Sequence, residues 1–369
     1  MLELYLYLAY LWIFSCLILW TWHGIRYRRV NKLLKGESPL AEAINAEPLS
    51  LIICAHNEAS NLKRLIPAWC EQDFENYEVL VVDDHSDDDS ELIVSQAMNQ
   101  YAHLRWLETP LNKPRGKKAA LRRGIEAAQY ENLVFCDADC LPATNQWLRR
   151  TADQLLKGEV VLGYGALRGE GFVAQLSDYE TLSTAFRYWS YALIGSAYMV
   201  VGRNLAYRKS SMSAPQSLAK HADLLSGDDD LTLKEMSGDL KVNCMVAPET
   251  FTYSEAAPNL KSWWRQKGRH YSTAWRYANA IKLSLGVEAA FQLIFVLLLP
   301  LAIWQLPIAL FLPLFLGRWF LSGFPKKAQW PLIQQKRQAW FWPFYEMFWA
   351  IAATLLHLRN LVFGPPKKW

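Results

Sequence analysis

The sequence predicts an α/β domain built on a mostly parallel sheet, with apolar helices of membrane-spanning length at both ends of the chain. Short apolar runs alternate with helix-like patterns through the middle of the chain, and nearly uncharged stretches lie near both termini. Carboxylates directly follow several of the predicted strands. Because the carboxyl ends of parallel strands meet at one edge of a sheet, these carboxylates are expected to share one ligand site.

Apolar runs of strand length predict the sheet. They occupy residues 49–55, 78–82, 104–107, 133–136 and 160–162. Between the first two runs, apolar side chains recur at helical spacing, at Leu62, Leu65, Ile66 and Trp69. This alternation is typical of a sheet whose two faces are covered by helices.

The N-terminal apolar stretch predicts a membrane anchor. Residues 4–22 carry no charge, and a run of about 20 apolar residues crosses a hydrocarbon core about 30 Å thick. A secretory signal peptide begins with a basic region, whereas Glu3 is acidic here and the arginines follow the apolar run. Arg26, Arg28 and Arg29 place the polar region that follows on the cytoplasmic side.

A second apolar region near the C-terminus predicts a helical hairpin. Residues 287–324 contain only Glu288 and Arg318 as charged residues, and a proline-containing break at 305–307 divides them. Arg318 is expected to extend toward the basic loop at 326–327 without a functional role, because long basic side chains reach the membrane surface in this way.

The last apolar stretch, 339–363, is interrupted by Glu346, His357 and Arg359. It predicts either a fourth crossing or a partly interfacial segment, and we favour four crossings. Against a fourth crossing, the basic tail at 367–368 is typical of the cytoplasmic side.

Composition agrees with a membrane-associated protein. The chain of 369 residues is 52% hydrophobic and has 17 Trp, many of them beside the apolar segments. The net charge of +4 comes from basic clusters beside those segments, a pattern that suits an anionic membrane surface rather than nucleic acid. The six cysteines form no metal-binding spacing, so we expect reduced core residues in a cytosolic compartment.

Asp137 and Asp139 follow the fourth predicted strand with one residue between them. Side chains two residues apart on a strand share a face, so the strand is expected to present both carboxylates together. Two adjacent carboxylates suit a hard divalent cation that is shared with phosphate oxygens. The pair therefore predicts a metal site for a nucleoside diphosphate.

Other polar motifs follow the remaining strands or lie farther along the chain. They are Ala55-His56-Asn57-Glu58, Asp83-Asp84-His85-Ser86-Asp87, Arg115-Gly116-Lys117-Lys118, Val201 to Arg208, Gly227-Asp228-Asp229-Asp230 and Gln266-Lys267-Gly268-Arg269. Taken alone, each has an ordinary explanation: Asp84 as a turn residue, Lys117 as a solvated lysine, and the three aspartates as a solvated acidic loop. Their combination in this order is far more informative.

The ordered set, from residue 48 to about 285, resembles the family 2 glycosyltransferases, specifically their membrane-integrated bacterial members. The resemblance implies a GT-A fold and an inverting sugar transfer from a nucleotide-sugar donor. It assigns the nucleotide-sugar site to Ala55, Asn57, Glu58, Asp84, Lys117, Asp137, Asp139, Gln266 and Arg269. Within this site it implies that Asp84 recognises the base, usually uracil, and that Asp139 holds Mg²⁺ or Mn²⁺ with Asp137.

The resemblance also implies where the acceptor is activated. It places the catalytic base in the acidic motif before a helix; Asp228 is the preferred candidate and Asp229 the alternative. Gln266 and Arg269 match a motif that in relatives closes over the diphosphate and acceptor. His270 stands where polymerising members carry Trp, so transfer of one or a few sugars is expected rather than processive synthesis.

These observations predict a domain order. The expected parts are a transmembrane anchor (1–25), a basic linker (26–47), a nucleotide-sugar-binding half (48–165), an acceptor-side half with the catalytic base (166–255), interfacial amphipathic helices (256–286) and a C-terminal transmembrane region of about three helices with a basic tail (287–369). The expected enzyme lies in a bacterial cytoplasmic membrane with its catalytic domain in the cytoplasm.

The expected partners are a nucleotide-sugar donor, by resemblance a UDP-sugar, a lipid-linked or glycan acceptor, and membrane lipids; nucleic acid is not expected. A processive polysaccharide synthase and a catalytically inactive nucleotide-binding scaffold are the alternative functions.

Overall fold

The computed structural model describes residues 2–36, 46–110, 116–212, 227, 230–236, 240–320, 332–334 and 340–364. The chain divides into two compact units. The helical unit contains Met1–Lys35, Gly169–Ser190 and Ala257–Pro366, and the sheet unit contains Gly36–Arg168, Tyr191–Ala256 and Lys367–Trp369. The two units thus interleave along the sequence.

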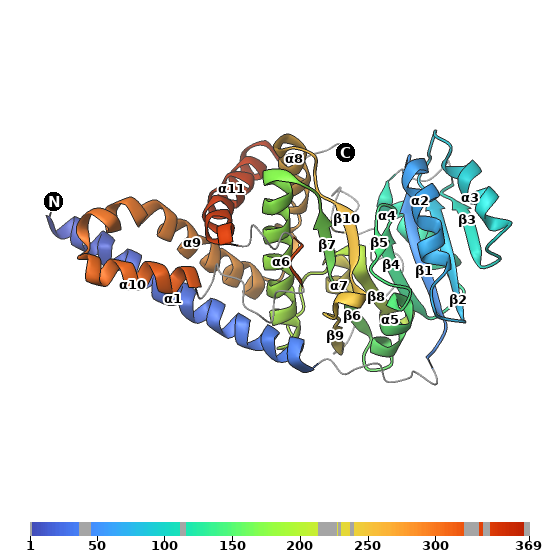
Figure 1. Cartoon of the computed structure of the whole chain (residues 1–369), viewed down its shortest axis with the longest axis horizontal. Coiled ribbons are helices and arrows are strands. Elements are labelled where there is room, and N and C mark those ends of the chain that lie inside the picture. Colours follow the sequence, from blue (N-terminus) through green and yellow to red (C-terminus); the bar gives the residue numbers. More distant parts are fainter. Residues whose placement is uncertain are drawn as a thin grey trace. The chain divides into compact units, whose positions relative to one another are not determined.

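The sheet unit is built on a seven-stranded sheet with the order β3-β2-β1-β4-β8-β6-β9. Strands β1, β2, β3 and β4 run parallel, and β8 is antiparallel to both β4 and β6 (Figure 1). The bounds are β1 Leu49–Ala55, β2 Tyr77–Asp83, β3 Leu104–Glu108, β4 Asn132–Asp137, β6 Val160–Leu162, β8 Leu205–Arg208 and β9 Val242–Cys244. The prediction of a mostly parallel sheet is confirmed.

Helices cover both faces of this sheet. Alternate side chains of β1 point to opposite faces: Leu51 and Ile53 join a buried cluster that includes Trp69, whereas Ile52 faces Gly124. A Cβ at Gly124 would lie 2.6 Å from Ile52 Cγ2, so the helix can approach the sheet only with glycine there. The helices are α2 (Ala59–Cys70), α3 (Ser90–Met98), α4 (Lys117–Ala127), α5 (Trp147–Leu155) and the short α7 (Asp230–Glu235).

A second, three-stranded sheet has the order β5-β10-β7. Its strands are β5 Leu141–Pro142, β7 Gly165–Arg168 and β10 Thr252–Glu255, and short 3-10 turns occupy Gly202–Asn204, Lys209–Ser211, Pro248–Thr250 and Ala274–Arg276. The buried amide of Asn204 accepts from Trp147 Nε1 at 3.1 Å and donates to the Thr250 carbonyl at 2.8 Å. These bonds link α5 to the segment that enters β10.

The helical unit contains most of the long helices. Its helices are α1 (Leu2–Gly36), α6 (Gly171–Ala192, of which the last two residues belong to the sheet unit), α8 (Leu260–His270), α9 (Asn279–Gln305), α10 (Ile308–Arg318) and α11 (Trp342–Phe363). The predicted hairpin break is confirmed, because α9 ends at Gln305 and α10 begins after Pro307. Trp12 of α1 packs between Phe295 and Phe311, with each ring centroid 5.5 Å away.

Two of the described helices, α1 and α9, are long and apolar enough to cross a membrane. Helix α10 has 11 residues, which extend only about 16 Å at 1.5 Å per residue. Helix α11 packs on α9 and also contacts α6 and α8: Tyr345 bonds Gln175, and Asn360 Nδ2 donates to the Gly268 carbonyl at 3.0 Å. Among the described helices only α1 and α9 meet both criteria, so the preference for four crossings is not confirmed and the position of α11 stays a prediction.

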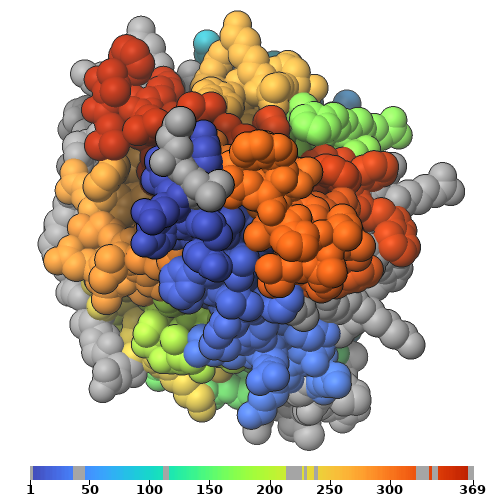
Figure 2. Space-filling model, turned by 90° about the vertical axis from the view of Figure 1, so that its left-hand side faces the viewer, coloured from blue at the N-terminus to red at the C-terminus, as the bar shows by residue number. Residues whose placement is uncertain are grey.

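The outer face of α1, α9 and α10 is apolar. In Figure 2 the blue N-terminal part of α1 and the orange α10 lie side by side on this face. Among the exposed large side chains are Tyr7 (70%), Trp304 (73%) and Ile308 (70%). Large exposed apolar side chains of this kind suit contact with lipid better than contact with water.

Three charged residues of these helices, Arg26, Glu288 and Arg318, are buried in the helical unit and form ion pairs. Arg318 is only 3% exposed and donates two hydrogen bonds to Glu346, at 3.1 and 2.5 Å. The expectation that Arg318 reaches toward a basic loop is wrong, because α10 ends where α11 presents a carboxylate. Arg26 pairs with Glu288 in the same two-bond geometry, at 2.9 and 2.7 Å. Pairing offsets the cost of removing these charges from water.

Candidate functional site

The acidic pair lies at the carboxyl end of β4. Asp137 is the last residue of the strand, and a tight turn follows in which the Cys140 amide donates to the Asp137 carbonyl at 3.0 Å. Asp139 therefore lies in the turn, so the expectation that one strand face presents both carboxylates is wrong. The turn nevertheless brings the two together: one ligand atom each of Asp137, Asp139 and Cys140 lie within 4.8 Å of one another.

The Cys140 thiol lies against Asp139. It is fully buried, and burial raises its pKa well above the usual range. The thiol donates to Asp139 Oδ1 at 3.4 Å and lies 2.8 Å from Ser254 Oγ. The Ser254 hydroxyl also donates to Asp139 Oδ1, at 3.4 Å. Strand β10, which carries Ser254, thus helps to hold this carboxylate in place.

Lys117 neutralises one member of the pair. Its Nζ donates to Asp137 Oδ1 at 2.6 Å. Burial would raise the pKa of Asp137, but the Lys117 ammonium outweighs burial and holds the pKa below its usual range. Burial and the neighbouring charge of Asp137 raise the pKa of Asp139. The two carboxylates therefore differ: one is already compensated, and the other lacks a cation in direct contact among the described residues.

The start of α4 places Lys117 beside the pair. Gly116 precedes the helix with φ of 126°, a conformation that other L-residues rarely adopt. Its amide donates to Asp84 Oδ1 at 2.8 Å, and the Asp84 amide donates to the Ala55 carbonyl at 2.8 Å. Asp84 thus connects the ends of β1 and β2 to the start of α4.

The loops after β1 and β2 also hold each other. The Asn57 amide donates to Ser86 Oγ at 2.9 Å, and Asn57 Oδ1 accepts from the Asp87 amide at 2.8 Å. Asn57 adopts φ of 56°, which asparagine tolerates better than most residues. These reciprocal bonds fix the backbone at the carboxyl edge of β1 and β2.

Glu58 lies in the electrostatic field of the acidic pair. Burial raises its pKa, and the charges of Asp139 and Asp137 add to that rise. Asn61 donates to its Oε2 at 2.7 Å. The sheet unit thus contains seven of the expected site residues, at strand ends, just beyond them or at the start of α4: Ala55, Asn57, Glu58, Asp84, Lys117, Asp137 and Asp139. A pocket with about 330 Å³ of empty space, part of it open to the outside, adjoins Lys117 and Asp137.

Arg203 is a basic residue near the pair to which the sequence assigned no role. Its charge lowers the pKa of both Asp137 and Asp139. Thr252 Oγ1 donates to its carbonyl at 2.8 Å, and a Cβ at Gly165 would lie 2.8 Å from Arg203 Cβ. In the sequence, Arg203 comes just before the apolar residues of β8. Because β8 was not predicted, its pairing with β4, which brings Arg203 near the acidic pair, was not predicted either.

Gln266 and Arg269 lie on α8 of the helical unit, and both are half-buried. Between them, Lys267 is buried and forms an ion pair with Glu180 of α6. Burial, with the charge of Arg265 nearby, lowers the pKa of Arg269. The Lys267–Glu180 ion pair and the hydrogen bond from Asn360 to the Gly268 carbonyl hold α8 in one orientation. They therefore fix the direction in which Gln266 and Arg269 project from the helix.

The two candidate bases, Asp228 and Asp229, lie outside the described residues, as does Arg115. The preceding Gly227 is buried, and α7 begins at Asp230. The assignment of the base therefore stays a prediction.

Comparison with known families identifies two related matches. The family described as Glycosyl transferase family 2 matches residues 50–211, and Glycosyl transferase family group 2 matches residues 134–356. The second match covers more than half of the chain.

Curated relatives match shorter segments. Glycosyltransferase AglE of Haloferax volcanii is 38% identical over 104 residues, 28% of this chain and 33% of that protein. Beta-monoglucosyldiacylglycerol synthase of Trichormus variabilis is 27% identical over 125 residues, 33% of this chain and 25% of that protein. Undecaprenyl-phosphate 4-deoxy-4-formamido-L-arabinose transferase of Aeromonas hydrophila is 33% identical over 168 residues, 38% and 48% of the two chains. The matches thus span between a quarter and a half of these relatives.

A solved structure shares the fold over nearly the whole chain. A mannosyltransferase from Pyrobaculum calidifontis, in complex with GDP-Man and Mn²⁺, superposes with a TM-score of 0.56 at 18% identity, covering 96% of this chain and 99% of that one. The family match, the mostly parallel sheet and this fold agree. The chain therefore belongs to family 2 of the glycosyltransferases and has their GT-A fold.

Proposed function

We propose that this glycosyltransferase moves a sugar from a nucleotide-sugar donor, a UDP-sugar, to a lipid-linked or membrane-proximal glycan acceptor at the cytoplasmic face of the membrane, with inversion at the anomeric carbon. The observation that carries the proposal is the acidic pair at the end of β4, with candidate ligand atoms of Asp137 and Asp139 within 4.8 Å and Lys117 bonded to one of them. This arrangement suits a metal-bound diphosphate.

Asp139 and Asp137 would hold the divalent cation, Mg²⁺ or Mn²⁺. Carboxylate oxygens are ligands that both ions prefer, and the 4.8 Å limit on their separation is compatible with one shared ion. When bound, the cation supplies charge neutralisation at the departing nucleoside diphosphate. The mannosyltransferase with the same fold binds Mn²⁺ together with its donor, which supports the proposal.

The chain's own residues would hold the rest of the donor. Asp84, connected to the loops through its bonds to Gly116 and Ala55, would accept from the base. Asn57 and Glu58 would line the nucleoside pocket. Lys117 would offer its ammonium to the diphosphate, since a phosphate oxygen could replace the Asp137 oxygen that it now bonds.

The acceptor hydroxyl would lose its proton to Asp228, with Asp229 as the alternative base. As the hydroxyl oxygen forms its bond to the anomeric carbon, the bond from that carbon to the diphosphate oxygen breaks, and the electron pair leaves with the nucleotide. Attack opposite the leaving group inverts the configuration. Arg269 and Gln266 would close over the diphosphate and acceptor from α8.

The membrane location rests on α1 and α9, the two described helices that are both long and apolar enough to cross a membrane, and on the arginines that follow the apolar part of α1. Two relatives carry undecaprenyl phosphate and a diacylglycerol product in their names, which supports a lipid-borne acceptor. A bacterial cytoplasmic membrane is the compartment that we propose.

A screen of nucleotide sugars against membranes that contain the protein tests this function. Supplied with Mn²⁺, the wild-type protein should transfer radiolabel from one donor into a lipid-extractable product. Asp139→Ala should lower transfer by at least about 100-fold. Asp228→Asn should abolish transfer while donor binding persists, and Glu170→Gln, which changes an exposed carboxylate, should leave both unchanged.

The outcomes separate the alternatives. Inactivity with every donor would refute the proposal and favour a nucleotide-binding scaffold. A ladder of long glycans on a sizing gel would favour a processive synthase. Turnover by Asp228→Asn close to that of the wild type would remove Asp228 from its role, and Asp229→Asn would then be the test of the alternative base.

A further inference from the structure

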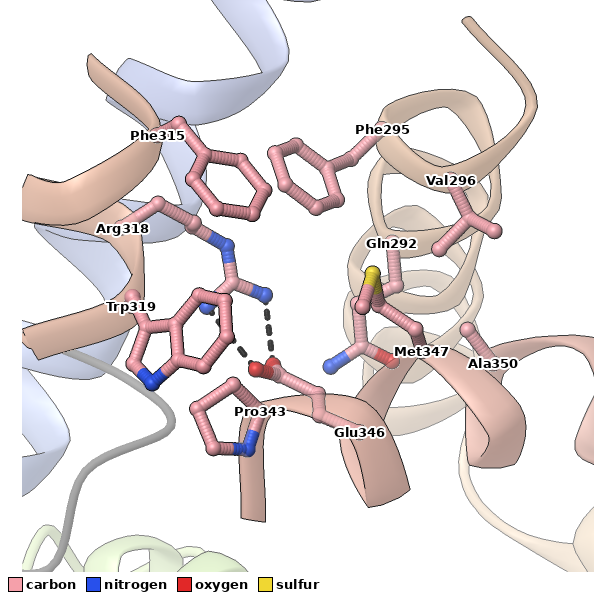
Figure 3. A pocket seen from close by; sticks show the side chains of 10 residues that line it. All are labelled: Gln292, Phe295, Val296, Phe315, Arg318, Trp319, Pro343, Glu346, Met347 and Ala350. Atoms are coloured by element: carbon pink, nitrogen blue, oxygen red, sulfur yellow. Dashed lines mark hydrogen bonds and ion pairs between the residues drawn. The ribbon is translucent and has the colours of Figure 1, made fainter. Parts of the chain in front are cut away.

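A pocket with about 350 Å³ of empty space, part of it open to the outside, lies among α9, α10 and α11 in the helical unit. Most of its wall is apolar and aromatic, formed by side chains such as Phe295, Phe315 and Trp319. Figure 3 shows the Arg318 and Glu346 side chains facing each other across one side of it, with the amide of Gln292 close by. The cavity thus combines an apolar wall with a small polar region.

The helices indicate the depth of the cavity in a bilayer. At one end of the bundle, Tyr5 of α1 contacts Trp304 of α9. Toward the other end, Arg26 pairs with Glu288 where the apolar parts of both helices stop. Gln292 is one helical turn beyond Glu288, a rise of about 6 Å. In a bilayer, this is the level of the glycerol backbone and first methylenes of the lipids on that side.

The charges of the cavity compensate each other. Arg318 and Glu346 are 3% and 6% exposed, and two hydrogen bonds join them. A phosphate placed against Arg318 would lie beside the Glu346 carboxylate and be repelled by it. An uncharged polar group avoids that repulsion, so the polar region suits a hydroxyl or an ester carbonyl.

Gln292 offers the matching hydrogen bonds. Its side-chain amide has no hydrogen-bond partner among the described residues, although it lies in a helix long and apolar enough to cross a membrane. An amide both donates and accepts, and leaving it unpaired in an apolar layer is costly. A ligand that carries both a hydroxyl and ester carbonyls would satisfy it.

We propose that this cavity binds an uncharged glycerolipid of the diacylglycerol class. The glycerol hydroxyl and ester carbonyls lie against Gln292 and the Arg318–Glu346 pair, and the acyl chains run along the aromatic wall toward the lipid. The inference rests on the membrane location in the proposed function but not on sugar transfer. Binding is therefore measured without any nucleotide sugar.

The test uses the full chain in phosphatidylcholine nanodiscs and a diacylglycerol that carries a photoactivatable diazirine on one acyl chain. After illumination, the labelled peptides are identified by mass spectrometry. Label is expected on peptides of α9 or α11, and dioleoylglycerol should compete with the probe at least fivefold more effectively than dioleoylphosphatidic acid. The two competitors differ by the phosphate alone.

Two variants alter the cavity in different ways. Val296→Trp fills it, and Gln292→Leu removes its amide while adding to the apolar character of α9. Each should lower labelling at least fivefold. The matched control is Leu297→Trp, the same residue introduced one position along α9 at a side chain that is 64% exposed, and it should label like the wild type.

Two results would overturn the inference: labelling that Gln292→Leu leaves unchanged, or competition by phosphatidic acid equal to that by diacylglycerol. Size-exclusion profiles show whether Val296→Trp folds; if it does not, Gln292→Leu alone decides. Because the transfer screen measures a radiolabelled product and this test measures a lipid cross-link, failure of one is distinguishable from failure of the other.

Discussion

The buried ion pair between Glu180 of α6 and Lys267 of α8 is expected to hold the helix that carries Gln266 and Arg269. Its side chains are only 9% and 6% exposed, so neither charge can be solvated by water when its partner is lost. Lys267→Met keeps the length and apolar stem of the side chain and removes only the ammonium. The variant therefore leaves the Glu180 carboxylate buried without this cation.

The magnitude follows from that burial. Removing one partner of a buried pair costs about 3–5 kcal/mol, whereas replacing both partners with apolar residues is often neutral or stabilising. Lys267→Met alone should therefore lower the free energy of unfolding by about 3 kcal/mol or more. The double variant Glu180→Leu with Lys267→Met should recover most of that loss, which gives a coupling energy of about 2 kcal/mol or more.

The assay compares stability with transfer. Denaturant unfolding in detergent gives the free energies, and transfer at saturating donor gives the turnover. Since Gln266 and Arg269 flank Lys267 on the same helix, a displaced α8 should lower turnover in Lys267→Met more than donor affinity. Lys261→Met makes the same change at an exposed position of α8, and it should leave both quantities unchanged.

One outcome contradicts this reasoning directly. If Lys267→Met lowers the free energy of unfolding by less than about 1 kcal/mol, the pair behaves like a surface ion pair. If the double variant instead loses the sum of the two single losses, Glu180 and Lys267 are not coupled, and the orientation of α8 depends on other contacts.

Three further changes test other parts of the fold. In Gly116→Ala the added methyl group meets no atom within 4 Å, but alanine is strained at φ of 126°. The change should lower the free energy of unfolding by about 1–3 kcal/mol and weaken nucleotide binding measured by calorimetry. The control Gly24→Ala, in helix α1, should leave nucleotide binding unchanged. Glu288→Gln removes the carboxylate that accepts two hydrogen bonds from Arg26. It should lower the free energy of unfolding in detergent by about 3–5 kcal/mol. An unchanged midpoint of the unfolding transition would refute the pairing. Asn204→Leu removes hydrogen bonds to an indole and two carbonyls. It should lower the free energy of unfolding, measured with denaturant, by at least about 2 kcal/mol. A smaller loss would mean that water replaces these hydrogen bonds.

The central strands were predictable because their side chains are apolar on both faces. The run at 49–55 coincides with β1, and the run at 133–136 lies within β4. Parallel strands buried under helices read as continuous apolar stretches, so unbroken apolar runs of strand length located them. The polar residues that follow them, such as Asp84 and Asp137, then lie close together because parallel strands end at the same edge.

The second sheet was not predictable in this way. Strand β5 has two residues and β10 has four, too few for a periodic signal. The antiparallel β8 comes from a distant part of the sequence, so only tertiary packing places Arg203 near the acidic pair. The same packing brings Ser254 to Asp139, a contact that neither motif nor spacing indicates.

The sequence by itself determined the α/β class, the order of the site motifs and the family, because strand periodicity, the motifs that follow the strands and the apolar ends are local properties of the chain. Only the tertiary structure decided which charges meet. Arg318 pairs with Glu346 instead of reaching a membrane surface, and Asp139 reaches Asp137 through a turn instead of along a strand. The physical reason is that the environment of a charge depends on residues distant in sequence. The free-energy cost of burying a charge is offset only where a partner from another element lies within hydrogen-bond distance.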